Sequence, residues 1–148
     1  MFILIVGAGR VGSAVAKYAL AAGHEVSVID EDPLSHERLD AGQQTTWEDA
    51  GGQFTVGTAL ELDALTQAGV ERADVFIAST DGDNTNLIIA QIAQRQFGVE
   101  KVIARVMDPA RASWYSDQGL HTISPAQEAI EMFKEALHAH IEAGAGAG

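Results

Sequence analysis

The sequence predicts an α/β domain, a doubly wound parallel sheet of about six strands followed by one more helix. Short apolar, β-favouring runs alternate with segments of helical periodicity, which is typical of strand–helix–strand units. The first run, 2–6, is continuously apolar, as expected of a strand that helices bury on both faces. Because such crossovers are right-handed, successive units build one parallel sheet with helices on both faces.

Glycine and proline set the limits of the elements in the first half of the chain. Gly23 supplies a left-handed stop for the first helix, and Pro33 can open the second at its first position. The polar, glycine-bearing segment 42–53 is left unassigned. In chain order we predict strand 2–6, helix 10–22, strand 25–29, helix 36–41 and strand 54–56.

The same alternation continues through the second half. Gly69 ends a helical segment, and the run Asp-Val-Phe-Ile-Ala-Ser follows it as a strand. In order we predict helix 60–68, strand 74–79, helix 85–97, strand 102–106, helix 109–118 and a short strand near 122–123.

A last helix, 126–142, follows a sheet that is already complete. Its apolar residues form one stripe, which needs a partner. That partner is either the rest of the same domain or the same helix of a second copy in a dimer. We expect 1–125 to be one α/β unit, 126–142 a crossover or dimerisation helix, and 143–148, which alternates Ala and Gly, a flexible tail or cloning remnant. The stripe consists of Ile130, Phe133, Leu137 and Ile141.

Composition excludes several classes of function. The 148 residues carry 21 acidic and 9 basic side chains, for a formal net charge of −12. Nucleic acid is therefore an unlikely partner, because phosphate binding needs clustered Lys and Arg. The chain has no Cys, which excludes disulfides and thiolate chemistry. No run approaches the roughly 18–20 apolar residues of a membrane span, and we expect a cytoplasmic protein.

A glycine-rich turn connects the first strand to the first helix. It reads Gly7-Ala8-Gly9-Arg10-Val11-Gly12, the G-x-G-x-x-G spacing of dinucleotide-binding, Rossmann-like folds. Gly7 permits the tight turn, Gly9 lets a pyrophosphate approach the backbone, and Gly12 packs helix against strand. The N–H groups of the helix N-terminus can then bind phosphate, and Arg10 either pairs with a phosphate or is exposed.

Polar residues after the strands complete the predicted site. Asp30 lies 18 residues after Gly12, where an acid binds the ribose diol and repels a 2′-phosphate, which favours NAD over NADP. Glu31 adds negative charge there. The run Ser79-Thr80-Asp81 lies at the carboxyl end of its strand, where hydroxyls reach a ribose. Asn84 contacts the ligand or lies in a helix cap.

No catalytic residues and no metal site are predicted. A dehydrogenase needs an acid–base residue beside the nicotinamide and a substrate pocket that a second domain usually supplies. The five His are scattered, and His138 and His140 do not have the four-residue spacing of a helical metal pair.

Several motifs in order resemble the N-terminal domain of the RCK family, the regulators of potassium conductance, and most nearly the Trk-type potassium-uptake regulatory proteins. The likeness runs from 3 to about 125. The motifs are Val-Gly-Ala-Gly-Arg-Val-Gly at 6–12, Gly-His-Glu-Val at 23–26, Ile-Asp-Glu-Asp-Pro at 29–33, Leu-Thr-Gln-Ala-Gly-Val-Glu-Arg-Ala-Asp at 65–74, Asp-Gly-Asp-Asn-Thr-Asn-Leu at 81–87, Ala-Arg-Val-Met-Asp-Pro at 104–109 and Gly-Leu-His-Thr-Ile-Ser-Pro at 119–125.

The resemblance implies a non-enzymatic cytoplasmic regulatory subunit at the inner face of the cell membrane. Such domains bind NAD, NADH, ATP or ADP, assemble as homodimers or rings through the helix after the sixth strand, and gate a potassium transporter or channel by a conformational change. The glycine loop, Asp30, Ser79 and Thr80 correspond to the ligand residues of the family. Arg105 is a weaker candidate for ligand or interface contact, and Thr58 and Ala59 are candidates after the third strand.

Two departures from the family leave alternatives open. Many relatives have Gly-Asp after the third strand, with the acid near the adenine, where this chain has Gly57 and Thr58. Many also have a second regulatory lobe, so this chain is either a shortened form or a one-lobe subunit that pairs with a two-lobe RCK subunit. The alternative functions are a small NAD-dependent oxidoreductase or its cofactor domain, and an assembly module with a vestigial nucleotide site.

Overall fold

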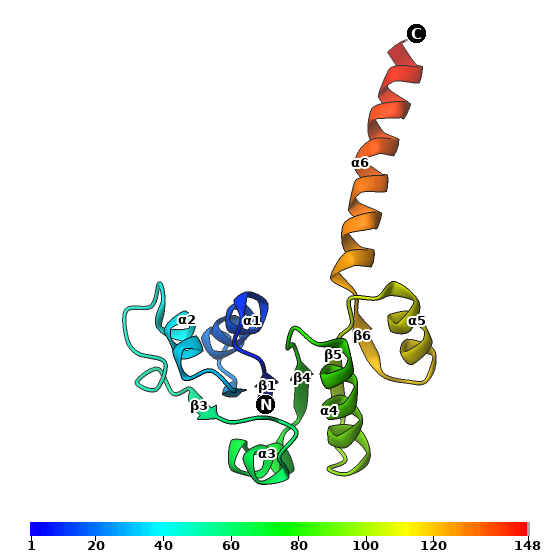
Figure 1. The fold of residues 1–148 in the computed structure, drawn as a ribbon. Coiled ribbons are helices and arrows are strands. Elements are labelled where there is room, and N and C mark those ends of the chain that lie inside the picture. Colours follow the sequence, from blue (N-terminus) through cyan, green and yellow to red (C-terminus); the bar gives the residue numbers. More distant parts are fainter. Residues whose placement is uncertain (148) are drawn as a thin grey trace.

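The computed structural model describes residues 1–147 and contains one six-stranded sheet (Figure 1). All five strand pairs are parallel, and the order β3-β2-β1-β4-β5-β6 is that of a doubly wound sheet. The predicted fold class is therefore confirmed. The order reverses between β1 and β4, the place where such sheets bind ligands. The strands are β1 Phe2–Val6, β2 Glu25–Asp30, β3 Gln53–Val56, β4 Val75–Ala78, β5 Lys101–Arg105 and β6 His121–Ile123.

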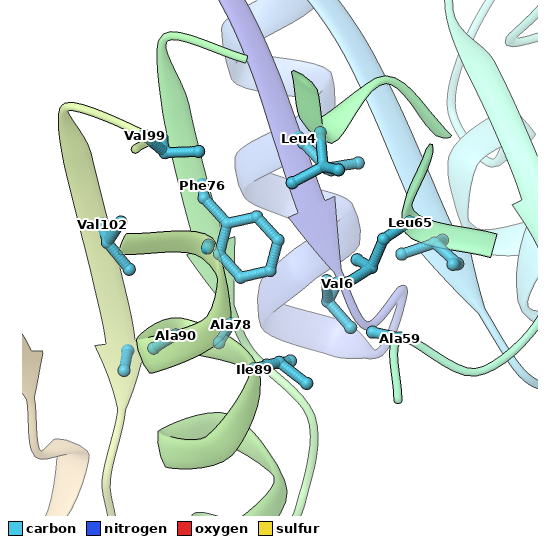
Figure 2. Close-up of a cluster of buried hydrophobic side chains, with 14 of the residues drawn as sticks. Leu4, Val6, Ala59, Leu65, Phe76, Ala78, Ile89, Ala90, Val99 and Val102 are labelled. Atoms are coloured by element: carbon cyan, nitrogen blue, oxygen red, sulfur yellow. The ribbon is translucent and has the colours of Figure 1, made fainter. Parts of the chain in front are cut away.

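Helices cover both faces of the sheet. On one face, α1 and α2 pack against β1 and β2 through a cluster that includes Ala16, Leu39 and Trp47. On the other, α3 and α4 pack against a cluster in which Phe76 and Leu65 are fully buried (Figure 2). The helices are α1 Arg10–Ala21, η1 Pro33–Ser35, α2 His36–Asp40, α3 Leu62–Ala68, η2 Val70–Arg72, α4 Asp83–Arg95, α5 Pro109–Asp117 and α6 Pro125–Ala147.

The unassigned segment 42–53 is held to the domain by Trp47. This side chain is 1% exposed, and its Nε1 donates a 2.9 Å hydrogen bond to the carbonyl of Gln53. A Cβ at Gly52 would lie 2.1 Å from the Trp47 ring, so only glycine fits there. The segment is thus an irregular connection with a buried aromatic anchor.

Helix α6 leaves the domain and projects away from the sheet (Figure 1). From 128 to 146 every residue is exposed, including Phe133 at 77% and Leu137 at 60%. The alternative that the stripe packs back on its own domain is therefore wrong. Helix α6 continues through 143–147, part of the segment predicted as a flexible tail or cloning remnant. Gly148 lies outside the described residues. Within 1–147, no helix is both long and apolar enough to cross a membrane.

Candidate functional site

A cavity of about 490 Å³ opens at the carboxyl ends of the central strands. This volume lies within the range of small-molecule sites. The cavity spans the point where the strand order reverses, with residues after β1, β2, β3 and β4 in its wall. The lining residues are Val6, Gly7, Gly9, Ile29, Asp30, Glu31, Asp32, Ser35, Arg38, Gly57, Thr58, Ala59, Ser79, Thr80, Asp81, Gly82 and Thr85.

The three glycines of the loop after β1 have different physical roles. Gly7 has φ +100°, and a Cβ there would lie 2.8 Å from the carbonyl oxygen of Ser79. A Cβ at Gly12 would lie 1.8 Å from the carbonyl oxygen of Gly7, so α1 packs directly on the turn. At Gly9 no atom lies within 4 Å of an added Cβ. Gly9 therefore leaves space beside the N-terminus of α1, where free N–H groups favour an anion.

Asp30 joins the glycine loop to the connection after β2. Its Oδ2 accepts a 2.7 Å hydrogen bond from the N–H of Ala8, and its Oδ1 accepts a 2.8 Å bond from the N–H of Asp32. A carboxylate offers roughly four acceptor positions, so about two remain for a ribose diol. The side chain therefore fixes the shape of the loop and also retains the capacity to bind a sugar.

At the end of β4, the hydroxyls predicted to meet a ribose are bonded within the protein. Ser79 is 8% exposed, and its Oγ donates to the carbonyl of Val6 at 2.9 Å, which ties β4 to β1. Thr80 Oγ1 donates to Asn86 Oδ1 at 2.6 Å. Both residues still line the cavity and can accept hydrogen bonds from a ligand.

Asn86, on α4, is a buried hydrogen-bonding centre that the predicted site omits. It is 0% exposed. Its Oδ1 also accepts from the N–H of Thr80 at 2.9 Å, while Nδ2 donates to the carbonyls of Thr80 at 3.0 Å and Arg105 at 2.9 Å. Asn86 therefore holds the loop after β4 against the end of β5. The sequence gives one signal, an amide on the apolar face of a helix.

Most of the predicted site residues come together at the cavity, but six do not line it. Ala8 contributes only its N–H, to Asp30, and Gly12 is packed against the turn. Arg10 and Val11 are exposed on α1. The predicted residues that line the cavity are Gly7, Gly9, Asp30, Glu31, Thr58, Ala59, Ser79, Thr80 and Asp81.

The other two lie near the rim, away from the lining. Asn84 is exposed and its Oδ1 accepts a 2.8 Å hydrogen bond from Arg111. Arg105 is a quarter exposed; its Nη1 lies 3.4 Å from the carbonyl oxygen of Thr80 and 3.5 Å from Asp81 Oδ1. Arg105 therefore contacts the loop after β4 without lining the cavity.

Arg38 is the lining residue of greatest chemical interest that sequence reasoning missed. It lies on the short helix α2, outside any motif, and no spacing rule directs it toward the glycine loop. Acidic side chains line the same part of the cavity, at Asp30, Glu31 and Asp32. Among the cavity-lining residues within 1–147, Arg38 is the only cation.

A family model described as the TrkA-N domain matches residues 3–125. The Trk system potassium uptake protein TrkA of Streptomyces coelicolor is 41% identical over 143 residues, which are 96% of this chain and 61% of that protein. The chain thus spans about three-fifths of the length of this relative.

Two solved structures share the fold at lower identity. The Kef CTD of Shewanella denitrificans in AMP bound form has a TM-score of 0.73 and 24% identity, over 94% of this chain and 81% of that one. A GsuK channel bound to NAD has a TM-score of 0.74 and 21% identity, over 96% of this chain and 24% of that one. These likenesses support the fold, including the sheet order described above.

Proposed function

Because the chain belongs to the TrkA-N domain family, we propose that it is the nucleotide-sensing regulatory part of a potassium uptake transporter or channel. The relative from Streptomyces carries the name of a potassium uptake protein, and a neighbour in fold is a channel bound to NAD. On this proposal the protein is not an enzyme. It works in the cytoplasm, at the inner face of the membrane, where its partner is the membrane subunit.

The observation that carries the proposal is the pairing of an open phosphate position at Gly9 with a ribose acceptor at Asp30. The two belong to one cavity at the strand-order reversal. NAD or NADH fits this arrangement, with the pyrophosphate at the N-terminus of α1 and the adenosine ribose at Asp30. Glu31 and Asp32 add negative charge that disfavours a 2′-phosphate. ATP and ADP are the alternative ligands, since they share the adenosine.

Hydrogen bonds connect the cavity to the base of α6. Asn86 bonds Thr80 at the cavity and the carbonyl of Arg105 at the end of β5. Two residues further along, the carbonyl of Met107 accepts a 3.1 Å hydrogen bond from Ser124 Oγ, directly before α6. A ligand that moves the loop after β4 can therefore change the orientation of α6 through these hydrogen bonds.

Helix α6 supplies the assembly surface in this proposal. Its apolar residues are exposed at positions that form one stripe, and a second copy of the helix covers such a stripe in a dimer or ring. A nucleotide with tenfold preference for one arrangement of the assembly contributes about 1.4 kcal/mol toward it.

Thermal unfolding with NADH, NAD, NADPH, ADP and ATP tests the binding step. A ligand at about 100 times its Kd stabilises by about 2.7 kcal/mol, which raises Tm by about 5–10 °C for a chain of this size. We expect NADH or an adenine nucleotide to give this rise and NADPH to give less. No rise with any of the five refutes nucleotide sensing and favours a pure assembly module.

Gly9→Ala is the matched variant. Gly9 has φ −73°, which Ala adopts without strain, and the space beside it is open, so the unliganded Tm should stay within about 2 °C. The ligand-induced rise should fall, because the methyl group occupies the position expected for phosphate. The gating step has its own test: nucleotide affinity that is the same with and without the membrane partner would contradict it.

A further inference from the structure

Arg38 places a guanidinium in the cavity with most of its donors unused. Its Nη1 donates to the carbonyl of Ala8 at 3.4 Å, a long and weak hydrogen bond. The salt bridges formed by residues 1–147 do not include Arg38, although several carboxylates also line the cavity. A guanidinium has five N–H donors in one plane. Both the donors and the flat face are therefore available to a ligand.

The backbone that carries Arg38 is held from two sides. The next residue, Leu39, is 0% exposed in the cluster beneath α1 and α2. At the start of α2, His36 lies between two carboxylates, with Nδ1 3.2 Å from Asp40 Oδ2 and Nε2 2.5 Å from Glu48 Oε1. These contacts fix the short helix, so Arg38 can reorient its side chain without moving its base.

Arg38 reaches the cavity from α2, where its Nη1 contacts the carbonyl of Ala8, the residue whose N–H bonds Asp30. The phosphates belong beside Gly9 and the ribose beside Asp30. A base that extends beyond the ribose would meet cavity residues of α2 and of the connection after β3. Arg38, Thr58 and Ala59 line that wall. Arg10 is exposed and does not line the cavity.

The same wall lacks an aromatic side chain. Within the described chain, no Phe, Tyr, Trp or His lines the cavity. A guanidinium is planar and stacks flat on aromatic faces, whereas a Lys ammonium is a point charge without a flat face. We propose that the guanidinium of Arg38 stacks on the adenine base of the bound nucleotide. Arg38 is then the adenine-binding arginine of this site, an inference that rests on the proposed nucleotide binding.

A ligand series with one base and increasing phosphate number tests this assignment. Titrations followed by NMR give Kd for adenosine, AMP, ADP and ATP with the unmodified protein, Arg38→Ala, Arg38→Lys and Arg95→Ala. Arg95 is exposed at the end of α4 and outside the cavity lining, so it controls for the loss of one positive charge. Unliganded Tm is measured for each variant.

If Arg38 stacks on the adenine, its loss should reduce the affinity for all four ligands to a similar extent. Arg38→Ala should weaken all four ligands by a similar factor, about threefold to thirtyfold. Arg38→Lys should give nearly the same loss for adenosine, and Arg95→Ala should change adenosine affinity less than twofold. If Arg38→Ala unfolds, Arg38→Lys carries the test, since it keeps the charge and the aliphatic stem.

Three results are distinguishable. Unchanged adenosine affinity in both Arg38 variants overturns the assignment. A loss that grows with phosphate number, and that Lys restores, shows phosphate pairing and also overturns it. If the unmodified protein binds none of the four ligands nor NADH, the proposed nucleotide binding itself has failed, independently of Arg38.

Discussion

Replacing Asn86 by Ala tests whether one buried amide holds the loop after β4. The substitution removes the hydrogen bonds of Asn86 to the N–H and C=O of Thr80 and to the C=O of Arg105, and leaves the C=O of Thr80 with only a long contact to Arg105 Nη1 at 3.4 Å. An unsatisfied buried group costs about 1–3 kcal/mol, and Thr80 is half-buried, so we take the lower end for each. We expect Asn86→Ala to lower the free energy of unfolding by about 2–4 kcal/mol, and Tm by about 5–15 °C.

Urea and thermal unfolding measure this loss, with Asn84→Ala as the matched control. Asn84 lies half a turn away on the same helix, exposed, with one partner in Arg111. Its replacement should change stability by no more than about 0.5 kcal/mol. Asn86→Asp keeps the acceptor but loses both donors, and should be at least as destabilised as Asn86→Ala. An Asn86→Ala loss below about 1 kcal/mol, or one equal to that of Asn84→Ala, would refute the reasoning.

Three further outcomes are expected. Gly12→Ala should prevent normal folding or lower Tm sharply by circular dichroism, because its Cβ would lie 1.8 Å from the carbonyl oxygen of Gly7; an unchanged Tm would show that α1 can shift freely. Trp47→Ala should cost about 3–5 kcal/mol in urea unfolding, as expected for a fully buried Trp, and a loss below 1 kcal/mol would mean that the connection after α2 is not anchored there. Replacing Phe133 and Leu137 together by Asp should shift sedimentation from dimer to monomer with no change in core Tm, whereas an unaltered sedimentation coefficient would exclude α6 as the dimer surface.

The sheet could be predicted because local patterns determined it. Most strands contain a short apolar run, and their alternation with helical segments predicts a doubly wound parallel sheet. The largely polar β6 carries a weaker signal, and the order of the strands comes from the structure. The glycine loop and Asp30 followed from spacing alone. Helix limits were less certain: α4 begins at Asp83 and ends at Arg95, not at 85 and 97. Ends of helices depend on capping hydrogen bonds that local periodicity does not specify.

What the sequence did not reveal depends on contacts between distant segments. Arg38 meets the glycine loop only because Leu39 is buried under α1 and turns the helix that way. Trp47 lies in a polar segment, and only the packing of that segment against α1 shows it to be core. Ser79 lines the cavity as predicted, and its Oγ also donates to the end of β1, a contact that the sequence does not indicate. In each case tertiary geometry decides the role, and local composition gives no information about it.

Because α6 is exposed from 128 to 146, we expect α6 and the α/β unit to unfold in separate transitions. At about 1.5 Å per residue, its 23 residues extend about 35 Å, and a helix without packing partners is only marginally stable in water. Its helical order should therefore depend on protein concentration, whereas the α/β unit unfolds at a fixed temperature. The chain contains two Trp, at 47 and 114, both before α6. Trp fluorescence therefore follows the unfolding of the α/β unit alone. A change in helical circular dichroism without a change in Trp fluorescence reports the order of α6, and through it the assembly.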